Sequence, residues 1–223
     1  IYDWSGSFLG MEFNKIRHLV EPSIGYHDNE TFGVKRKQLY MFDTVDTANT
    51  LRQLVIGIEN RIQTKRKYKN ELKRVDVVSL NTYLFFDANS DLPGIEDTTG
   101  FTNMRNDITL RPYDWLVVEW INNINMMNGG FNNSNTDVVL SYKDKFSILI
   151  GHRYIPTESN MDGSSQLVID TEYKLNSRWS IGGYVRTEFD TGSVEEWELR
   201  LIRNLSCGWF LDFGYNVRKS EID

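Results

Sequence analysis

The stretch WSIGGYVRTEF, from Trp179 to Phe189, changes its polarity with every residue. One parity carries tryptophan, isoleucine, valine and phenylalanine, and the other carries tyrosine, arginine and glutamate. A period of two indicates an extended strand with two different faces. Segments 194–204 and 208–218 repeat the pattern. Strands of about ten residues with this alternation are typical of a transmembrane β-barrel, where one face meets lipid and the other lines a wet lumen.

The composition of the whole chain fits this interpretation. Aromatic residues make up 13% of the 223 residues, and only 4 residues are proline. The sequence contains no run of about 18 apolar residues, so it predicts no membrane-spanning helix. The low mean hydropathy is compatible with a barrel, because only alternate residues of a barrel strand face lipid. The net charge of -6 argues against a nucleic-acid partner. A lone Cys207 rules out an internal disulfide framework.

The alternation along the chain predicts an all-β fold, an antiparallel transmembrane β-barrel represented in part by about twelve strands. We expect these strands near residues 15–27, 32–40, 51–63, 75–87, 102–113, 115–127, 137–143, 146–155, 166–176, 179–190, 194–204 and 208–218. Because the chain starts without an initiator methionine and stops where another strand is expected, we interpret it as a fragment.

The expected connections between strands alternate in length. Short polar turns are predicted at 112–114, 143–145, 176–178 and 205–208, and longer loops rich in Asn, Asp, Gly and Ser at 89–100, 128–136 and 157–165. Several short turns lead into an aromatic residue, as an interfacial girdle requires: Trp115, Phe146, Trp179 and Trp209. This asymmetry predicts short periplasmic turns and longer extracellular loops. A soluble β-sandwich or lipocalin-like barrel also alternates and is the alternative fold.

The charged parity of the predicted strands supplies the candidate lumen-lining residues. Charges on the lipid face of a barrel would cost a few kcal/mol each, so we expect them to point into the lumen. These residues are Arg17, Glu21, Arg105, Asp107, Arg111, Glu119, Arg153, Asp170, Glu172, Arg186, Glu188, Glu198, Arg200 and Asp212.

No enzyme site is predicted. The three histidines, His18, His27 and His152, lack metal-ligand spacing, and no Gly-x-Ser-x-Gly motif occurs. Glu195 and Glu196 are adjacent, so on a strand they point to opposite faces and cannot act as a carboxylate pair. We therefore expect no catalytic residue, no metal and no cofactor.

The first part of the chain resembles a known family. Segment 15–26, KIRHLVEPSIGY, resembles the R-H-x-x-E-P-x-x-x-Y strand of the LptD family of lipopolysaccharide-assembly outer-membrane proteins, and segment 41–46, MFDTVD, is similar to its F-D-x-x-D segment. Segments 197–200, 207–209 and 213–215 near the end resemble the last strands of the family. The motif residues are Arg17, His18, Glu21, Pro22, Phe42, Asp43 and Asp46.

The resemblance implies that residues 1–223 are the C-terminal portion of the barrel domain, with the N-terminal jellyroll and the last strand absent. The implied function is insertion of lipopolysaccharide into the outer leaflet of a Gram-negative cell outer membrane through a lateral barrel seam. The implied partners are lipopolysaccharide, an LptE-like plug lipoprotein, outer-membrane lipids, and periplasmic lipopolysaccharide-bridge proteins that act through the jellyroll. By the same resemblance Cys207 pairs with a cysteine of the N-terminal domain; the alternative is a free thiol.

The basic cluster at 65–74 and Pro22 each allow more than one interpretation. The basic cluster at 65–70 with Lys73 and Arg74 could attract lipid phosphates at a membrane rim, or could be a solvated hairpin tip. Pro22 removes a ladder donor, so it predicts an edge, a bulge or a locally broken pairing. The alternative functions are a general porin-like or adhesin outer-membrane barrel and, less favoured, a soluble β-barrel or sandwich that binds a lipid or a sugar.

Overall fold

A computed structural model describes residues 2–8, 10–29, 51–68, 71–89, 99–157, 162–205 and 208–219. Phe42, Asp43, Asp46 and Cys207, and the strand expected at 32–40, lie outside these residues. The strands are β1 (Tyr2–Phe8), β2 (Met11–Asn29), β3 (Leu51–Tyr68), β4 (Glu71–Asn89), β5 (Gly100–Tyr113), β6 (Leu116–Asn125), β7 (Phe131–Tyr142), β8 (Phe146–Ile155), β9 (Ser164–Lys174), β10 (Trp179–Glu188), β11 (Val194–Asn204) and β12 (Phe210–Arg218).

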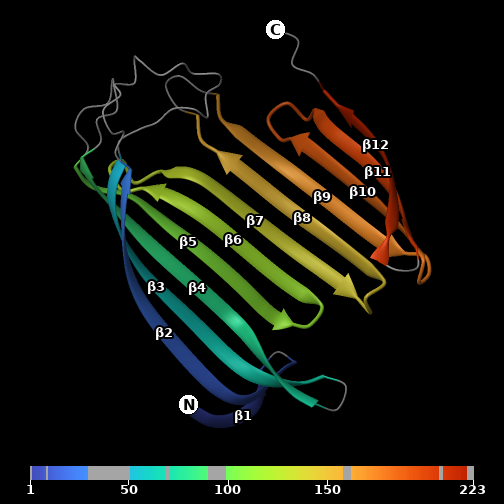
Figure 1. Ribbon diagram of the computed structural model, residues 1–223, viewed down its shortest axis with the longest axis horizontal. Coiled ribbons are helices and arrows are strands. Elements are labelled where there is room, and N and C mark those ends of the chain that lie inside the picture. Colours follow the sequence, from blue (N-terminus) through green and yellow to red (C-terminus); the bar gives the residue numbers. More distant parts are fainter. Residues whose placement is uncertain are drawn as a thin grey trace.

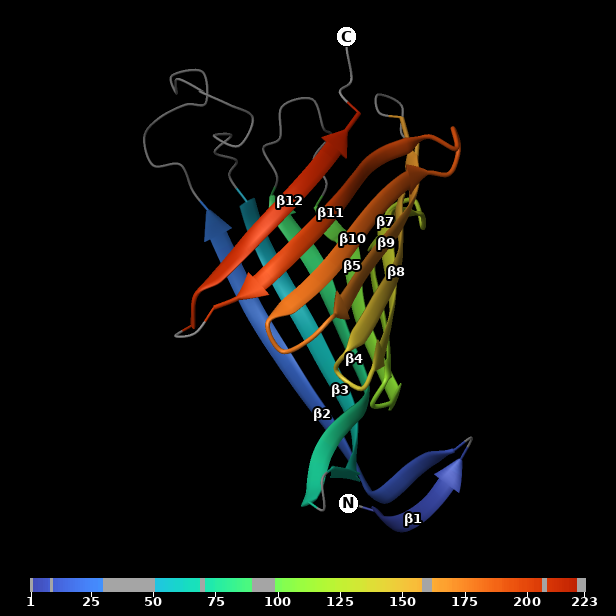
Figure 2. The same ribbon diagram turned by 90° about the vertical axis from the view of Figure 1, so that its right-hand side faces the viewer.

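All twelve strands belong to one sheet in the order of the sequence, and each pairs antiparallel with its neighbours along the chain (Figure 1). The predicted all-β antiparallel fold is therefore confirmed at this level. The sheet is not closed into a barrel: β12 has β11 as its sole partner in the described chain, and residues 17–29 of β2 pair with β3 alone. Strand directions alternate, so β2 and β12 point the same way (Figure 2).

The sheet has two different ends. The turns β5–β6, β7–β8, β9–β10 and β11–β12 occupy one end, which we call the tight-turn end. The opposite end, the loop end, carries the described connections β6–β7, at 126–130, and β10–β11, at 189–193. Lys143 and Asp144 both have positive φ (48° and 53°), as the central residues of a type I′ turn require, and Lys145 N closes this turn on the Tyr142 carbonyl oxygen at 2.9 Å.

Some element boundaries differ from the sequence prediction. β1 was not predicted, although Tyr2–Phe8 alternates apolar residues (Tyr2, Trp4 and Phe8) with the polar residues Asp3, Ser5 and Ser7. The loop predicted at 128–136 is wrong, since β7 starts at Phe131 and its Asn-rich first half pairs with β6. The basic cluster lies close to the tip of the β3–β4 hairpin, where Lys65 to Lys67 pair in register with Leu72 to Arg74.

Pro22 occupies an edge. The register of β2 on β3 runs without a shift from Arg17 to Asn29, so the bulge interpretation of Pro22 is wrong. Opposite Ile58, Pro22 lies where β2 has no second neighbour among the described residues. An edge tolerates proline because the missing N–H can face away from the neighbouring strand.

The sheet curls about its long direction, so that β10–β12 turn back in front of β2–β4 (Figure 2). Side chains crowd together on the inside of such a curve and splay apart on the outside. In β10, Ser180 and Gly182 are buried, whereas Ile181 is 44% exposed and Val185 38% exposed. We therefore assign the parity of Ser180, with its charged neighbours, to the inside of the curve.

Candidate functional site: the ion-paired face of the sheet

A row of directly opposed residues crosses the sheet and defines what we call the polar face. Residues that pair directly in an antiparallel ladder project from the same face. The row runs, from β2 to β12, through Leu19, Arg61, Ser79, Thr109, Glu119, Asp137, Gly151, Val168, Arg186, Glu196 and Arg218. Six of its eleven members are charged, and both signs are present.

Ion pairs join the strands along this face in the middle of the sheet. The guanidinium of Arg153 on β8 meets both carboxylate oxygens of Asp137 on β7, with Nη1–Oδ1 2.8 Å and Nη2–Oδ2 3.0 Å. The contact between Nη2 and Oδ2 is a hydrogen bond, whereas Oδ1 makes a close charge contact without one. Arg105 Nε lies 2.8 Å from Asp107 Oδ1 on the same strand. Each pair is half-buried, so the face is charged yet internally compensated.

A second group of ion pairs covers β9, β10 and β11. Arg200 Nη2 donates to Asp170 Oδ1 at 2.8 Å, although these residues lie on β11 and β9 with β10 between them. Arg200 Nε lies 3.7 Å from Glu198 Oε1. Arg186 Nη2 lies 3.3 Å from Glu196 Oε2 on the neighbouring strand. One arginine therefore bridges three strands.

Glycines on the polar face make room for these side chains. A Cβ on Gly151 would lie 2.5 Å from Asp137 Oδ1 and 3.1 Å from Arg153 Nη1. A Cβ on Gly182 would lie 3.2 Å from the Thr171 carbonyl oxygen and 3.5 Å from Arg200 Nε. The ion pairs thus depend on the absent side chains of two glycines in the strands beneath them.

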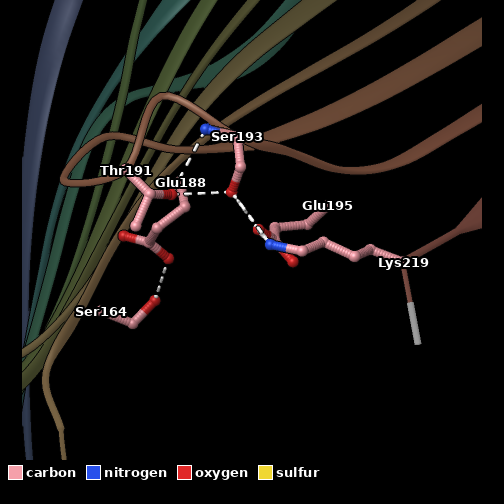
Figure 3. Close-up of polar contacts among 6 residues, drawn as sticks. All are labelled: Ser164, Glu188, Thr191, Ser193, Glu195 and Lys219. Carbon is pink, nitrogen blue, oxygen red and sulfur yellow. Dashed lines mark hydrogen bonds and ion pairs between the residues drawn. The ribbon is translucent and has the colours of Figure 1, made fainter. Parts of the chain in front are cut away.

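At the loop end the polar face closes with a hydrogen-bonded cluster (Figure 3). Glu188 accepts hydrogen bonds from Ser164 Oγ and Ser165 N, both at 2.7 Å. Across the β10–β11 connection, Lys219 Nζ lies 3.3 Å from Glu195 Oε1, which also accepts from Ser193 Oγ. These contacts tie β9, β10, β11 and the segment after β12 together where the connections are.

The opposite face, which we call the apolar face, carries mainly aliphatic and aromatic side chains, interrupted by the hydrogen-bonded residues Thr82, Asn106 and Asn122 on β4 to β6. One opposed row reads, from β2 to β12, His18, Ile62, Val78, Leu110, Val118, Val138, Ile150, Ile169, Val185, Trp197 and Val217. No second layer of described residues covers this face, since the strands form one sheet. Large apolar side chains along it are exposed, among them Leu199 at 55%.

Aromatic side chains border the apolar face at both ends. Tyr142, Phe146 and Tyr173 oppose one another in register at the tight-turn end, where Trp209 is 74% exposed. The loop end carries Tyr26, Phe101, Phe131, Tyr154 and Phe189, all exposed. The Arg203 guanidinium lies 5.1 Å from the centroid of the Trp179 ring. Aromatic rings therefore flank an aliphatic band.

All fourteen residues that the sequence assigned to a lumen project from the polar face, as the ladders and the two-residue period require. The structure joins Arg105 with Asp107, Arg111 with Glu119 at 3.9 Å, and Arg200 with Asp170 and Glu198. Arg17, Glu172 and Asp212 form no ion pair with another described residue. That the face lines a lumen stays a prediction.

Sequence reasoning missed three charged partners on this face. Asp137 pairs with Arg153, Glu196 with Arg186, and Arg61 with Glu21. The two-residue period alone could have placed Arg61 on the polar face, because Arg61 lies two residues after Glu59 in the same strand. The ladder register, which decides which charges meet, cannot be obtained from one strand at a time.

The described residues hold no group of three or more His, Cys, Asp and Glu side chains that could bind a metal ion. They also contain no helix long and apolar enough to cross a membrane. The chain matches no model of a known protein family and no curated protein sequence.

Proposed function

We propose that this chain forms part of the wall of an outer-membrane β-barrel that exports lipopolysaccharide. The observation that carries the proposal is the single-layer sheet with an uncovered apolar face and an ion-paired polar face. In this proposal the apolar face meets lipid and the polar face lines the lumen. Further strands between β12 and β2 complete the wall, because pairing these two strands directly would be parallel.

The dimensions of the strands support a place in the membrane. A strand of 10 residues, such as β6, β8 or β10, rises about 34 Å, and with a tilt of about 45° it spans about 24 Å. Outer-membrane barrels carry an apolar band of about 25 Å between two aromatic girdles. The aromatic rows at both ends of the apolar face match this arrangement. A soluble sheet would leave this face unprotected.

Export of lipopolysaccharide, as distinct from another barrel function, rests on the resemblance of segment 15–26 to the LptD family and on the polar face. A charged, hydrated lumen would accept the sugar portion of the glycolipid, while its acyl chains stay in hydrocarbon. Pro22 at the edge of β2 weakens pairing there, because a further strand cannot receive a hydrogen bond from it. A porin-like diffusion barrel is the second candidate, favoured by facing charges of both signs on the polar face.

The membrane placement is tested with single-tryptophan variants of the full-length protein in vesicles that contain brominated acyl chains. Trp179 and Trp209, kept one at a time on the apolar face, are expected to be quenched strongly. The control is Tyr184→Trp in a tryptophan-free background, because residue 184 projects from the polar face. Equal quenching at all three positions would rule out the assignment of the two faces.

Export is tested with a photo-crosslinking amino acid in living Gram-negative cells. Placed at Tyr184 on the polar face, it should capture lipopolysaccharide during active export, whereas a probe at Val185 should capture membrane lipid. No capture at residue 184, together with ion conductance in planar bilayers, would favour the porin-like alternative over export.

A further inference from the structure

β2 divides between two partners near the tight-turn end of the sheet. Its first residues, Met11 to Ile16, pair with β1, and from Arg17 onward it pairs with β3. Lys15 lies at the division in the left-handed region, with φ of 58°. Figure 2 shows the β1–β2 hairpin leaving the sheet at this level. We call this place the fork.

A buried threonine fixes the fork. Thr64 of β3 is 1% exposed, and its Oγ1 accepts from Asn14 N at 2.9 Å and donates to Asn14 O at 3.3 Å. The hydroxyl thus takes the place of a ladder partner beside the strained Lys15. Left-handed backbone is unfavourable for a lysine, and strain held in place in this way is concentrated at functional sites.

The fork borders a half-open cavity of about 230 Å³ whose charged lining is entirely basic. It is lined by Lys15, Arg17, Gln63, Thr64, Lys65 and Arg74. Four basic residues line this cavity, although the net charge of the chain is -6. Arg17, Lys65 and Arg74 form no ion pair with a described residue, in contrast to Arg105, Arg153 and Arg200 higher on the polar face. Uncompensated cations around a cavity are the arrangement that binds an anion.

Gln63 adds a second requirement for the ligand. Its side chain is 8% exposed, and its Nε2 donates to Asp76 Oδ1 at 2.6 Å. Its Oε1 is buried and has no hydrogen-bond partner. A buried acceptor without a partner is costly, so a ligand that supplies a donor is stabilised there. The ligand should therefore combine an anion with a hydroxyl or similar donor.

Arg66, which the sequence placed within the same basic cluster, takes no part in the cavity. It is 8% exposed, and its guanidinium is engaged by Asp114 at 3.2 Å and by the carbonyl oxygens of Arg111 and Pro112 at 2.9 and 2.6 Å. Lys65 and Arg66 are neighbours in β3, yet their side chains make different contacts. Lys65 is left for a ligand, while Arg66 secures the β5–β6 turn.

We propose that the fork is a binding site for a phosphomonoester that carries hydroxyl groups. The phosphate lies among Arg17, Lys65 and Arg74, and a hydroxyl donates to Gln63 Oε1. A sugar phosphate and a phosphorylated lipid headgroup share this chemistry. As a station for a phosphorylated glycolipid the site rests on the proposed function, but phosphomonoester binding itself needs neither a membrane nor transport.

Binding is measured by titration calorimetry on the full-length protein in neutral detergent, with glucose 6-phosphate, inorganic phosphate and glucose as probes. Glucose 6-phosphate should bind most tightly, with an affinity that falls as salt is added. The double variant K65Q/R74Q should bind it about ten-fold or more weakly, since two charge-assisted contacts are lost. The control K145Q/K174Q removes the same charge at the tight-turn end, outside the fork, and should change the affinity less than about two-fold.

Gln63→Leu should keep the affinity for inorganic phosphate and lose the preference for glucose 6-phosphate. Competition by phosphatidic acid added to the micelles assigns the site to a lipid headgroup, and its absence assigns it to a soluble ester. Equal losses of affinity for glucose 6-phosphate in the two double variants would show that the ester is attracted by overall charge and not by a specific site, and would overturn the proposal. So would the lack of saturable binding by the unaltered protein. Neither result would affect the assignment of the apolar face to lipid.

Discussion

The variant Leu199→Arg tests whether the apolar face lies in lipid or in water. The two placements predict changes of different size in the free energy of unfolding. Leu199 lies midway along β11 between Gly183 and Tyr215, and it is 55% exposed. In water, an arginine at such a surface position changes the free energy of unfolding by no more than about 0.5 kcal/mol. At the midplane of a bilayer, an arginine on the lipid face costs about 2–4 kcal/mol.

Loss of the leucine adds to that cost. Full burial of a leucine side chain contributes about 1.5–3 kcal/mol, so transfer of its exposed half to lipid contributes about 1 kcal/mol. We expect Leu199→Arg to lower the free energy of unfolding by about 3–5 kcal/mol in vesicles. Asn216→Arg is the control, because Asn216 is the next residue along β12 from Tyr215 and projects from the polar face. Its effect should stay below about 1 kcal/mol.

The assay is guanidinium unfolding of the vesicle-embedded protein, followed by tryptophan fluorescence under conditions where folding is reversible. The slope of the free energy against denaturant must be the same in all variants for the midpoints to be compared. Equal midpoints for the two arginine variants would refute the reasoning, because a face in contact with lipid cannot accept a charge as readily as a wet one.

Three further changes test the polar face and its supports. Gly151→Val should lower the free energy of unfolding by about 1–3 kcal/mol by displacing the Asp137 carboxylate, whereas Gly25→Ala, with no atom near its Cβ position, should have a small effect; chemical unfolding compares the two. A double-mutant cycle of Arg200→Gln and Asp170→Asn should give a coupling of about 1 kcal/mol that shrinks in high salt, since both side chains are partly exposed; a coupling insensitive to salt would contradict a solvated pair. Arg66→Ala should destabilise the protein by about 2–3 kcal/mol and speed hydrogen exchange at the β5–β6 turn, whereas Lys67→Ala, one residue along and exposed, should leave that exchange unchanged.

Much of the sheet follows from the sequence because one physical cause dominates. The period of two fixes both the strand and the face of each residue, and so all fourteen charged candidates reach one face once the strands pair in order. Places where another cause dominates were missed. The start of β7 reads as a loop because asparagines occupy it, although they pair there through amide hydrogen bonds such as Asn123 Nδ2 to Asn133 Oδ1 at 2.8 Å.

The set of basic residues at the fork could not be predicted from the sequence, for a different reason. Lys65 and Arg74 are visible as part of a charge run, but Arg17 joins them through its register opposite Gln63, and Lys15 lies there where β2 bends in a left-handed conformation. Nothing in the local sequence announces that bend. The same three-dimensional context removes Arg66 from the cluster by supplying Asp114 and two carbonyl oxygens.

The sequential order of the strands has a consequence for how this sheet forms and changes. Every ladder joins neighbours along the chain, so no connection crosses another and each hairpin can add to the growing edge as soon as its turn is made. A whole hairpin can also be inserted or removed without rerouting the rest, because the strands on either side keep their directions and still meet antiparallel. Duplication of hairpins is thus the simplest route by which such a wall gains or loses circumference.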